Sequence, residues 1–142
     1  MERQPLLSAE EVQEFVDEVF PQQRGIQEVV EIGPMTATAR MKIGHAHLRP
    51  GGTVSGPAMF TVADCAFYMA VLGMIGRQAL TVTTNLSINF LRKPAAETDL
   101  ICEARILKLG KLLATGDATV WSEGQAAPVA HATVTYAIPP ER

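Results

Sequence analysis

The longest apolar run in this chain, residues 57–75, is hydrophobic around its whole circumference when it is drawn as a helix. Its main polar interruptions are Thr61, Asp64 and Tyr68, and their i, i+3, i+7 spacing places them on one side of that helix. A helix that is apolar all round is buried, either in a membrane or in the core of a fold. The central carboxylate and the absence of flanking basic clusters favour the core. We therefore expect a buried central helix.

The rest of the pattern predicts one more helix and a set of strands. Ser8 and Glu11 have capping-box spacing ahead of an amphipathic stretch, so we expect a helix over residues 9–20 that ends at Pro21. Alternating β-branched and apolar residues, with turn residues at Gly33-Pro34 and Gly110-Lys111, predict strands over residues 26–31, 36–43, 79–91, 99–109, 112–122 and 128–138.

This order of elements predicts an α+β fold in which an antiparallel β-sheet wraps around the long helix. The chain has 142 residues, which is enough for one domain with a substantial core. We expect a single domain over residues 1–142, with residues 1–25 as an N-terminal helical extension. Because one curved sheet cannot cover every side of the helix, part of the helix is expected to face a second subunit.

Composition excludes several classes of function. The formal net charge of −3 does not indicate a protein that binds nucleic acid electrostatically. Cys65 and Cys102 are too few for a disulfide framework and lack metal-ligand spacing, so we expect free, buried thiols in a reducing compartment. The charged N-terminal segment lacks the apolar centre of an export signal. These features predict a cytoplasmic protein without a membrane partner.

Asp64 is the main candidate for chemistry. An unpaired charge in a buried helix costs on the order of several kcal/mol, or the carboxyl takes up a proton, so this carboxylate needs a compensating reason to be there. One reason is catalysis. The other is a structural role, with the carboxylate bonded to Thr61 or to a backbone group.

The glycine-rich loop before the helix, residues 47–57, supplies a second candidate group. Ser55 is a plausible N-cap, and the N–H of Gly56 is among the free amides of the helix start, which can bind an anion or a polarised carbonyl oxygen. Asp64 lies eight residues beyond Gly56, or roughly 12 Å along an ideal helix. One helix therefore cannot bring both groups to the same carbonyl. Two chains with antiparallel helices would, which predicts a dimer with shared sites.

Four segments of the sequence are informative together: HLRPGGTVSGPAMFTVADCAFYMA, TVTTNLSINFLRKPA, DLICEARILKLGKLLATGDATVWSEG and PVAHATVTYAI. They resemble hotdog-fold acyl-CoA thioesterases of the phenylacetate-degradation (PaaI) type, and the resemblance covers about residues 26–138. It implies an antiparallel sheet around a long helix, an acyl-CoA substrate and no cofactor or metal. It also implies a homodimer or homotetramer (a dimer of dimers) with active sites between subunits.

The resemblance extends to single residues. The family loop usually reads G-x-x-H-G-G, with an acidic residue eight positions beyond the first of the paired glycines. Residues 52–57 fill this loop, with Ser55 in place of the histidine and Pro57 in place of the second glycine, and Asp64 fills the acidic position. The implied activity is hydrolysis of an acyl-CoA thioester. Asp64 is then the nucleophile or general base, and the Gly56 N–H of the other subunit polarises the thioester carbonyl.

Other positions are candidates for binding the substrate. Arg49 stands where many relatives carry an asparagine near the carbonyl, and Thr83 matches a hydroxyl position that in some relatives helps hold the attacking water from the other subunit. Tyr68 is either a core residue or a substrate ligand. Four basic residues at strand ends either meet the phosphates of coenzyme A or are solvated charges: Arg92, Lys93, Lys108 and Lys111.

Several alternatives remain open from the sequence. Ser55 is a cap or, with a suitably placed histidine, a nucleophile. His45 and His47 face the same way if their segment is extended, but the sequence supplies no further metal ligands. A catalytically weak hotdog protein that binds acyl-CoA or another small ligand is the second reading, motivated by Ser55 in the histidine position. A hotdog dehydratase or hydratase is a third, and His47 is the one upstream histidine beside the loop for it.

Overall fold

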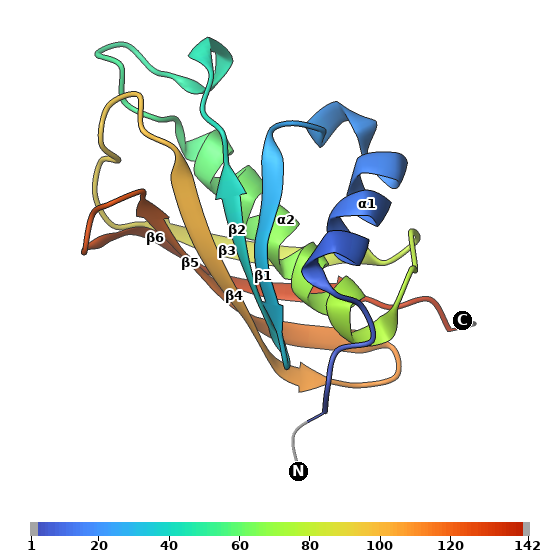
Figure 1. Ribbon diagram of the computed structural model, residues 1–142. Helices are drawn as coiled ribbons and strands as arrows, with labels where there is room; N and C mark the ends of the chain where they lie inside the picture. Colours follow the sequence, from blue (N-terminus) through green and yellow to red (C-terminus); the bar gives the residue numbers. More distant parts are fainter. Residues whose placement is uncertain (1–2, 141–142) are drawn as a thin grey trace.

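The computed structural model describes residues 3–140, and it has the expected α+β architecture of one sheet around a long helix (Figure 1). The sheet order is β1-β2-β4-β5-β6-β3, and every neighbouring pair is antiparallel. The elements, in chain order, are α1 (Ala9–Val19), the 3₁₀ turn η1 (Pro21–Gln23), β1 (Gln27–Gly33), β2 (Thr36–Met41), the 3₁₀ turn η2 (His45–His47), α2 (Gly56–Ile75), β3 (Val82–Phe90), β4 (Leu100–Leu109), β5 (Leu113–Ser122) and β6 (Pro128–Ala137).

The central helix α2 packs against every strand of the sheet, which is why its sequence is apolar on all sides. Phe67, Met69 and Leu72 are completely buried. Ser55 caps the helix as predicted, because its hydroxyl accepts a hydrogen bond from the Ala58 N–H. By length and hydropathy α2 also qualifies as a membrane span, but 78% of its apolar window is buried within the fold. The helix is therefore the core of this domain.

The strand boundaries differ from the predicted ones at two places. Residues 79–81 do not belong to β3, because Thr81 closes a turn through a hydrogen bond from its N–H to the Gln78 carbonyl. The β1–β2 turn is formed by Pro34 and Met35, so β1 extends to Gly33, and β2 ends at Met41, two residues earlier than predicted. Met35 takes the left-handed position of this turn with a φ of 61°, and its N–H donates to the sulfur of Met74.

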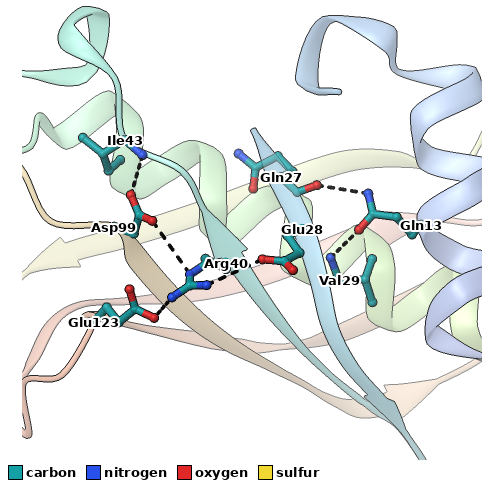
Figure 2. Close-up of polar contacts among 8 residues, drawn as sticks. All are labelled: Gln13, Gln27, Glu28, Val29, Arg40, Ile43, Asp99 and Glu123. Carbon is teal, nitrogen blue, oxygen red and sulfur yellow. Dashed lines mark hydrogen bonds and ion pairs between the residues drawn. The ribbon is translucent and has the colours of Figure 1, made fainter. Parts of the chain in front are cut away.

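The N-terminal helix α1 is hydrogen-bonded to the edge strand β1 through the side chain of Gln13 (Figure 2). Its amide nitrogen donates to the Gln27 carbonyl at 3.1 Å, and its amide oxygen accepts from the Val29 N–H at 2.7 Å. The side-chain amide thus pairs with the strand edge as a neighbouring strand does, and it covers an edge that is otherwise open to other chains. The predicted capping box of Ser8 and Glu11 starts the same helix.

We expect Gln13→Ala to lower the free energy of unfolding by about 1–3 kcal/mol, because two backbone groups of β1 lose their partners. Chemical denaturation measures this change. Glu14→Ala is the matched control, since Glu14 is the exposed neighbour on the same helix and its removal is expected to change stability by less than about 0.5 kcal/mol. Equal stability of the two variants contradicts the role assigned to Gln13.

An ion-pair network lies where β1, β2, β4 and β5 meet the loop ends (Figure 2). Arg40 on β2 contacts Glu28 on β1, Asp99 before β4 and Glu123 after β5. Asp99 also accepts a hydrogen bond of 2.8 Å from the Ile43 N–H. Ile43 begins the segment that leads to Gly56, so the network anchors the start of the glycine-rich loop.

Candidate active site

The Asp64 carboxylate lies in the third turn of α2 and receives its hydrogen bonds from the sheet. Its Oδ1 accepts from the Thr83 hydroxyl at 2.6 Å and from the Tyr136 hydroxyl at 2.8 Å. Thr61, which the sequence offered as a structural partner, does not contact Asp64, because its hydroxyl donates to the Pro57 carbonyl at 2.9 Å. The half-buried position of the carboxylate is thus compensated by two hydroxyl donors from strands that are distant in sequence.

Strand register brings these two donors together. Thr83 on β3 pairs directly with Tyr136 on β6, so their side chains leave the same face of the sheet beside each other. The pairing has a bulge directly after Thr83. The resemblance implied a Thr83 that acts from the other subunit, whereas the structure places its hydroxyl on Asp64 of the same chain.

The aromatic ring of Tyr136 is fixed by two neighbours on α2. It stacks on Tyr68 with ring centroids 5.9 Å apart, and it lies 5.6 Å from the Phe67 ring. Burial and the nearby Asp64 charge raise the pKa of the Tyr136 hydroxyl above its usual range. The hydroxyl therefore stays protonated and remains a hydrogen-bond donor at neutral pH.

A hollow with a volume of about 600 Å³ opens next to Asp64. Tyr68 lines it, while the Tyr68 hydroxyl is directed to the Ala79 carbonyl at 3.4 Å. The end of α1 also contributes to this wall, which sequence reasoning did not anticipate. The lining residues are Val19, Phe20, Gln22, Asp64, Tyr68, Ala79, Leu80, Thr81, Val82, Thr83 and Tyr136.

A second hollow, with a volume of about 380 Å³, surrounds the start of α2 at Gly56. Three of the predicted substrate-binding cations line it: Arg49, Arg92 and Lys93. Within residues 3–140 the Gly56 N–H donates to no acceptor, so it is available to a ligand. This hollow combines a free helix-terminal donor with positive charge.

The two hollows have no lining residue in common, so one chain does not bring Asp64 and Gly56 to one place. The spacing along α2 predicted this separation. Asp64, the predicted nucleophile or base, lines the apolar hollow, and Gly56, whose N–H is the predicted carbonyl donor, lines the basic one. A single reacting carbonyl would need Asp64 from one chain and Gly56 from another.

The remaining candidate residues line neither of the two hollows. Lys108 lies on β4 opposite Thr115, away from the basic hollow at Gly56, so it does not join Arg92 and Lys93 within one chain. His45 and His47 lie in the turn η2 and not on an extended segment, and His47 Nδ1 accepts from the Gly44 N–H. Within residues 3–140 no cluster of potential metal ligands is found.

The cysteines are free and buried, as predicted. Burial, together with the charge of Asp64, raises the pKa of the Cys65 thiol to about 12. Burial likewise raises the pKa of Cys102. Neither thiol is therefore an available nucleophile at neutral pH, even though Cys65 is the neighbour of Asp64 in sequence.

Residues 51–136, which include Gly56, Asp64, Thr83 and Tyr136, match the sequence model of the thioesterase superfamily. A protein from Silicibacter sp. TM1040, named as a candidate thioesterase, is 46% identical over 99% of this chain and 97% of its own, with a TM-score of 0.91. The chain belongs to the thioesterase superfamily. No match was found among the curated protein sequences.

More distant members of the thioesterase superfamily share the fold. Zebrafish thioesterase superfamily member 2 is 20% identical over 94% of this chain and 99% of its own, with a TM-score of 0.80. The phenylacetic acid degradation protein PaaI from Thermus thermophilus is 24% identical over 84% of this chain and 99% of its own, with a TM-score of 0.70. The predicted hotdog thioesterase family is thus confirmed, and this membership supports hydrolysis of thioesters as the general activity.

Proposed function

We propose that this protein hydrolyses an acyl-CoA thioester to the free acid and coenzyme A, with Asp64 of one subunit opposite the Gly56 N–H of another. The observation that carries this proposal is the Asp64 carboxylate itself. It is held by two hydroxyl donors on one oxygen and lies in a hollow next to apolar side chains from α1 and from the segment before β3. A carboxylate that is oriented by two hydroxyl donors and lines a hollow is a candidate catalytic group.

The chemistry follows one of two routes. As a general base, Asp64 takes a proton from a water molecule, and the water oxygen adds to the thioester carbonyl carbon. The oxyanion that forms accepts a hydrogen bond from the partner subunit's Gly56, the C–S bond breaks, and the sulfur leaves with a proton as the coenzyme A thiol. As a nucleophile, Asp64 displaces coenzyme A to form an anhydride, which water then hydrolyses to the acid and the free carboxylate.

The strand β3 supports a dimer in which the sites are shared. It lies at the edge of the sheet, so one side of its backbone has no partner strand among the described residues. Large apolar side chains at both ends of this strand are exposed: Leu80 by 78%, Val82 by 53%, Phe90 by 53% and Leu91 by 48%. Antiparallel pairing of two β3 strands covers this edge and sets the two α2 helices antiparallel. Each Asp64 then approaches a Gly56 from the other chain.

Each of the two hollows binds a different part of the substrate, the acyl group or the nucleotide. The acyl group enters the hollow of about 600 Å³, where Phe20, Leu80 and Val82 supply apolar contacts. The phosphates of coenzyme A meet Arg92 and Lys93 near the partner's helix start. Arg92 is oriented for this role because its Nε donates to the Pro128 carbonyl at 2.7 Å, which leaves its terminal nitrogens for a phosphate. The free cysteines support a cytoplasmic localisation.

The experiment that tests this function is a hydrolysis assay of the purified protein. It uses straight-chain acyl-CoAs from C2 to C16 and aryl acyl-CoAs, each compared with the N-acetylcysteamine thioester of the same acid, and follows thiol release. We expect turnover of acyl-CoAs and a KM at least about tenfold higher for the truncated thioesters, because these lack the phosphates. Absence of turnover across the whole panel contradicts the proposal.

The second candidate is a protein that binds acyl-CoA or another small ligand without rapid turnover. One observation favours it: neither hollow is lined by a histidine, and the Ser55 hydroxyl that stands in the family's histidine position accepts the capping hydrogen bond from Ala58. Titration calorimetry with a non-hydrolysable acyl-CoA thioether separates the two functions. Saturable binding by a protein that hydrolyses none of the panel assigns the chain to this second class.

A further inference from the structure

We propose that Tyr136 is a positioning residue that, together with Thr83, binds one oxygen of the Asp64 carboxylate and thereby presents the other oxygen to the reacting water or thioester. This inference rests on the proposed thioesterase function. It assigns a role to a residue of the last strand, which the motifs of the loop and the central helix do not include.

The hydrogen bonds distinguish the two carboxylate oxygens. The hydroxyls of Thr83 and Tyr136 both reach Oδ1, at 2.6 Å and 2.8 Å. Within residues 3–140 no hydrogen bond is made to Oδ2. Two donors on one oxygen fix the rotation of the carboxylate about its own axis. The free oxygen is therefore held in one direction, as a base or a nucleophile requires.

The Tyr136 hydroxyl also contacts the backbone of the residue that it positions. It lies 3.0 Å from the Asp64 carbonyl oxygen, so side chain and main chain of Asp64 meet the same phenol. The ring is 3% exposed and packs against Phe67 and Tyr68 on α2. Because the ring cannot turn away, its hydroxyl acts as a rigid support for the carboxylate.

The other titratable groups near Asp64 are neutral at the pH of an assay. Tyr136 and Tyr68 have raised pKa values because of burial, and Cys65 has a pKa raised to about 12 for the same reason. These groups therefore keep their protons near neutral pH, and the Tyr136 hydroxyl remains a donor to Asp64 Oδ1.

The test is Tyr136→Phe, which keeps the ring and removes the hydroxyl. With an acyl-CoA that the parent protein hydrolyses, we expect kcat to fall about tenfold or more while KM stays within about twofold. In a crystal structure of Tyr136→Phe, we expect the Asp64 carboxylate to rotate away from its parental orientation, because one of the two donors to Oδ1 is lost. Tyr68→Phe is the matched control. It removes a hydroxyl that is directed to Ala79 and not to Asp64, so the Asp64 carboxylate should keep its parental orientation whatever happens to KM.

A parental kcat in Tyr136→Phe, together with an Asp64 carboxylate in its parental orientation, overturns the inference. A lower melting temperature with parental kinetics overturns it as well, because Tyr136 is then only a packing residue. A crystal structure of Tyr136→Phe gives a readout that does not depend on turnover, with the carboxylate expected to rotate away from its parental orientation. If the parent protein hydrolyses no substrate, the proposed thioesterase function is contradicted. The positioning role is then tested by the crystal structure alone, and an unrotated carboxylate in the variant contradicts it.

Discussion

Asp64→Ala is expected to lower kcat for acyl-CoA hydrolysis by about 10³-fold or more while the protein keeps its fold and its subunit assembly. The variant lacks the group that is proposed to activate water or to attack the carbonyl. The side chain is partly exposed and lines an existing hollow, so its loss adds space without collapsing the core. It leaves the hydroxyls of Thr83 and Tyr136 without this acceptor, which costs about 1–3 kcal/mol of stability.

Asp64→Asn is the matched control for shape, because it preserves the volume and an acceptor oxygen and removes the charge. Both variants are measured by thiol release, and circular dichroism and light scattering establish fold and mass. We expect both to lose activity, since the chemistry needs the charged carboxylate. A variant that hydrolyses acyl-CoA at the parental rate removes Asp64 from the mechanism.

Gly56→Pro is expected to lower kcat about 10²-fold by deleting one backbone N–H. Proline suits the first helical position, where the N–H has no acceptor within the helix. The preceding Ser55 already has φ −74° and ψ 157°, which is the conformation that a residue before proline adopts. The variant therefore removes the proposed donor to the thioester carbonyl, and circular dichroism and light scattering establish that the fold and the assembly are kept.

Gly56→Ala is the control for the added atoms. A Cβ at this position meets the end of the Phe90 ring at 3.2 Å, which requires only a small movement of that side chain. Because alanine keeps the N–H, we expect Gly56→Ala to retain at least about ten times the activity of Gly56→Pro. Equal losses in the two variants indicate a steric effect and contradict the role of the N–H.

Co-expression of Asp64→Ala chains with Gly56→Pro chains tests whether the site is shared between subunits. In a mixed dimer, the Asp64 of one chain and the Gly56 of the other form one intact site. Random assembly then restores about one quarter of the parental activity, from two inactive parents. If both groups act within one chain, the mixture stays inactive. The activity of the mixture therefore distinguishes a site shared between subunits from a site within one subunit.

Much of the fold follows from local patterns in the sequence. The helix α2 is predicted because its residues are apolar on nearly all sides, and its central carboxylate and the absence of flanking basic clusters favour the core of a fold over a membrane. The capping box of Ser8 and Glu11 and the N-cap of Ser55 are equally local, since each joins residues three positions apart. The same kind of reasoning placed residues 79–81 in a strand, and this prediction is wrong. The segment is apolar and β-branched like a strand, but a turn at Thr81 ends the pairing.

The contacts of Asp64 could not be predicted from such local patterns. Thr83 reaches Asp64 from its own chain, and the sequence alone did not distinguish this from an approach by a second subunit. The contribution of Phe20 to the wall of the hollow was also not predicted. The position of α1 depends on the burial of its apolar side chains in the core and on the hydrogen bonds of Gln13 to β1. Neither contact is visible in a local pattern of polar and apolar residues.

The sequence by itself determined the buried helix, the carboxylate on it and the distance that separates this carboxylate from Gly56. These depend on helical periodicity and rise, which are the same in every protein. Only the tertiary structure decided which groups surround the carboxylate. Tyr136 is 72 residues away in the chain and reaches Asp64 because β6 pairs with β3 in one particular register. Such a contact depends on packing of the whole sheet around α2, so no local stretch of sequence specifies it.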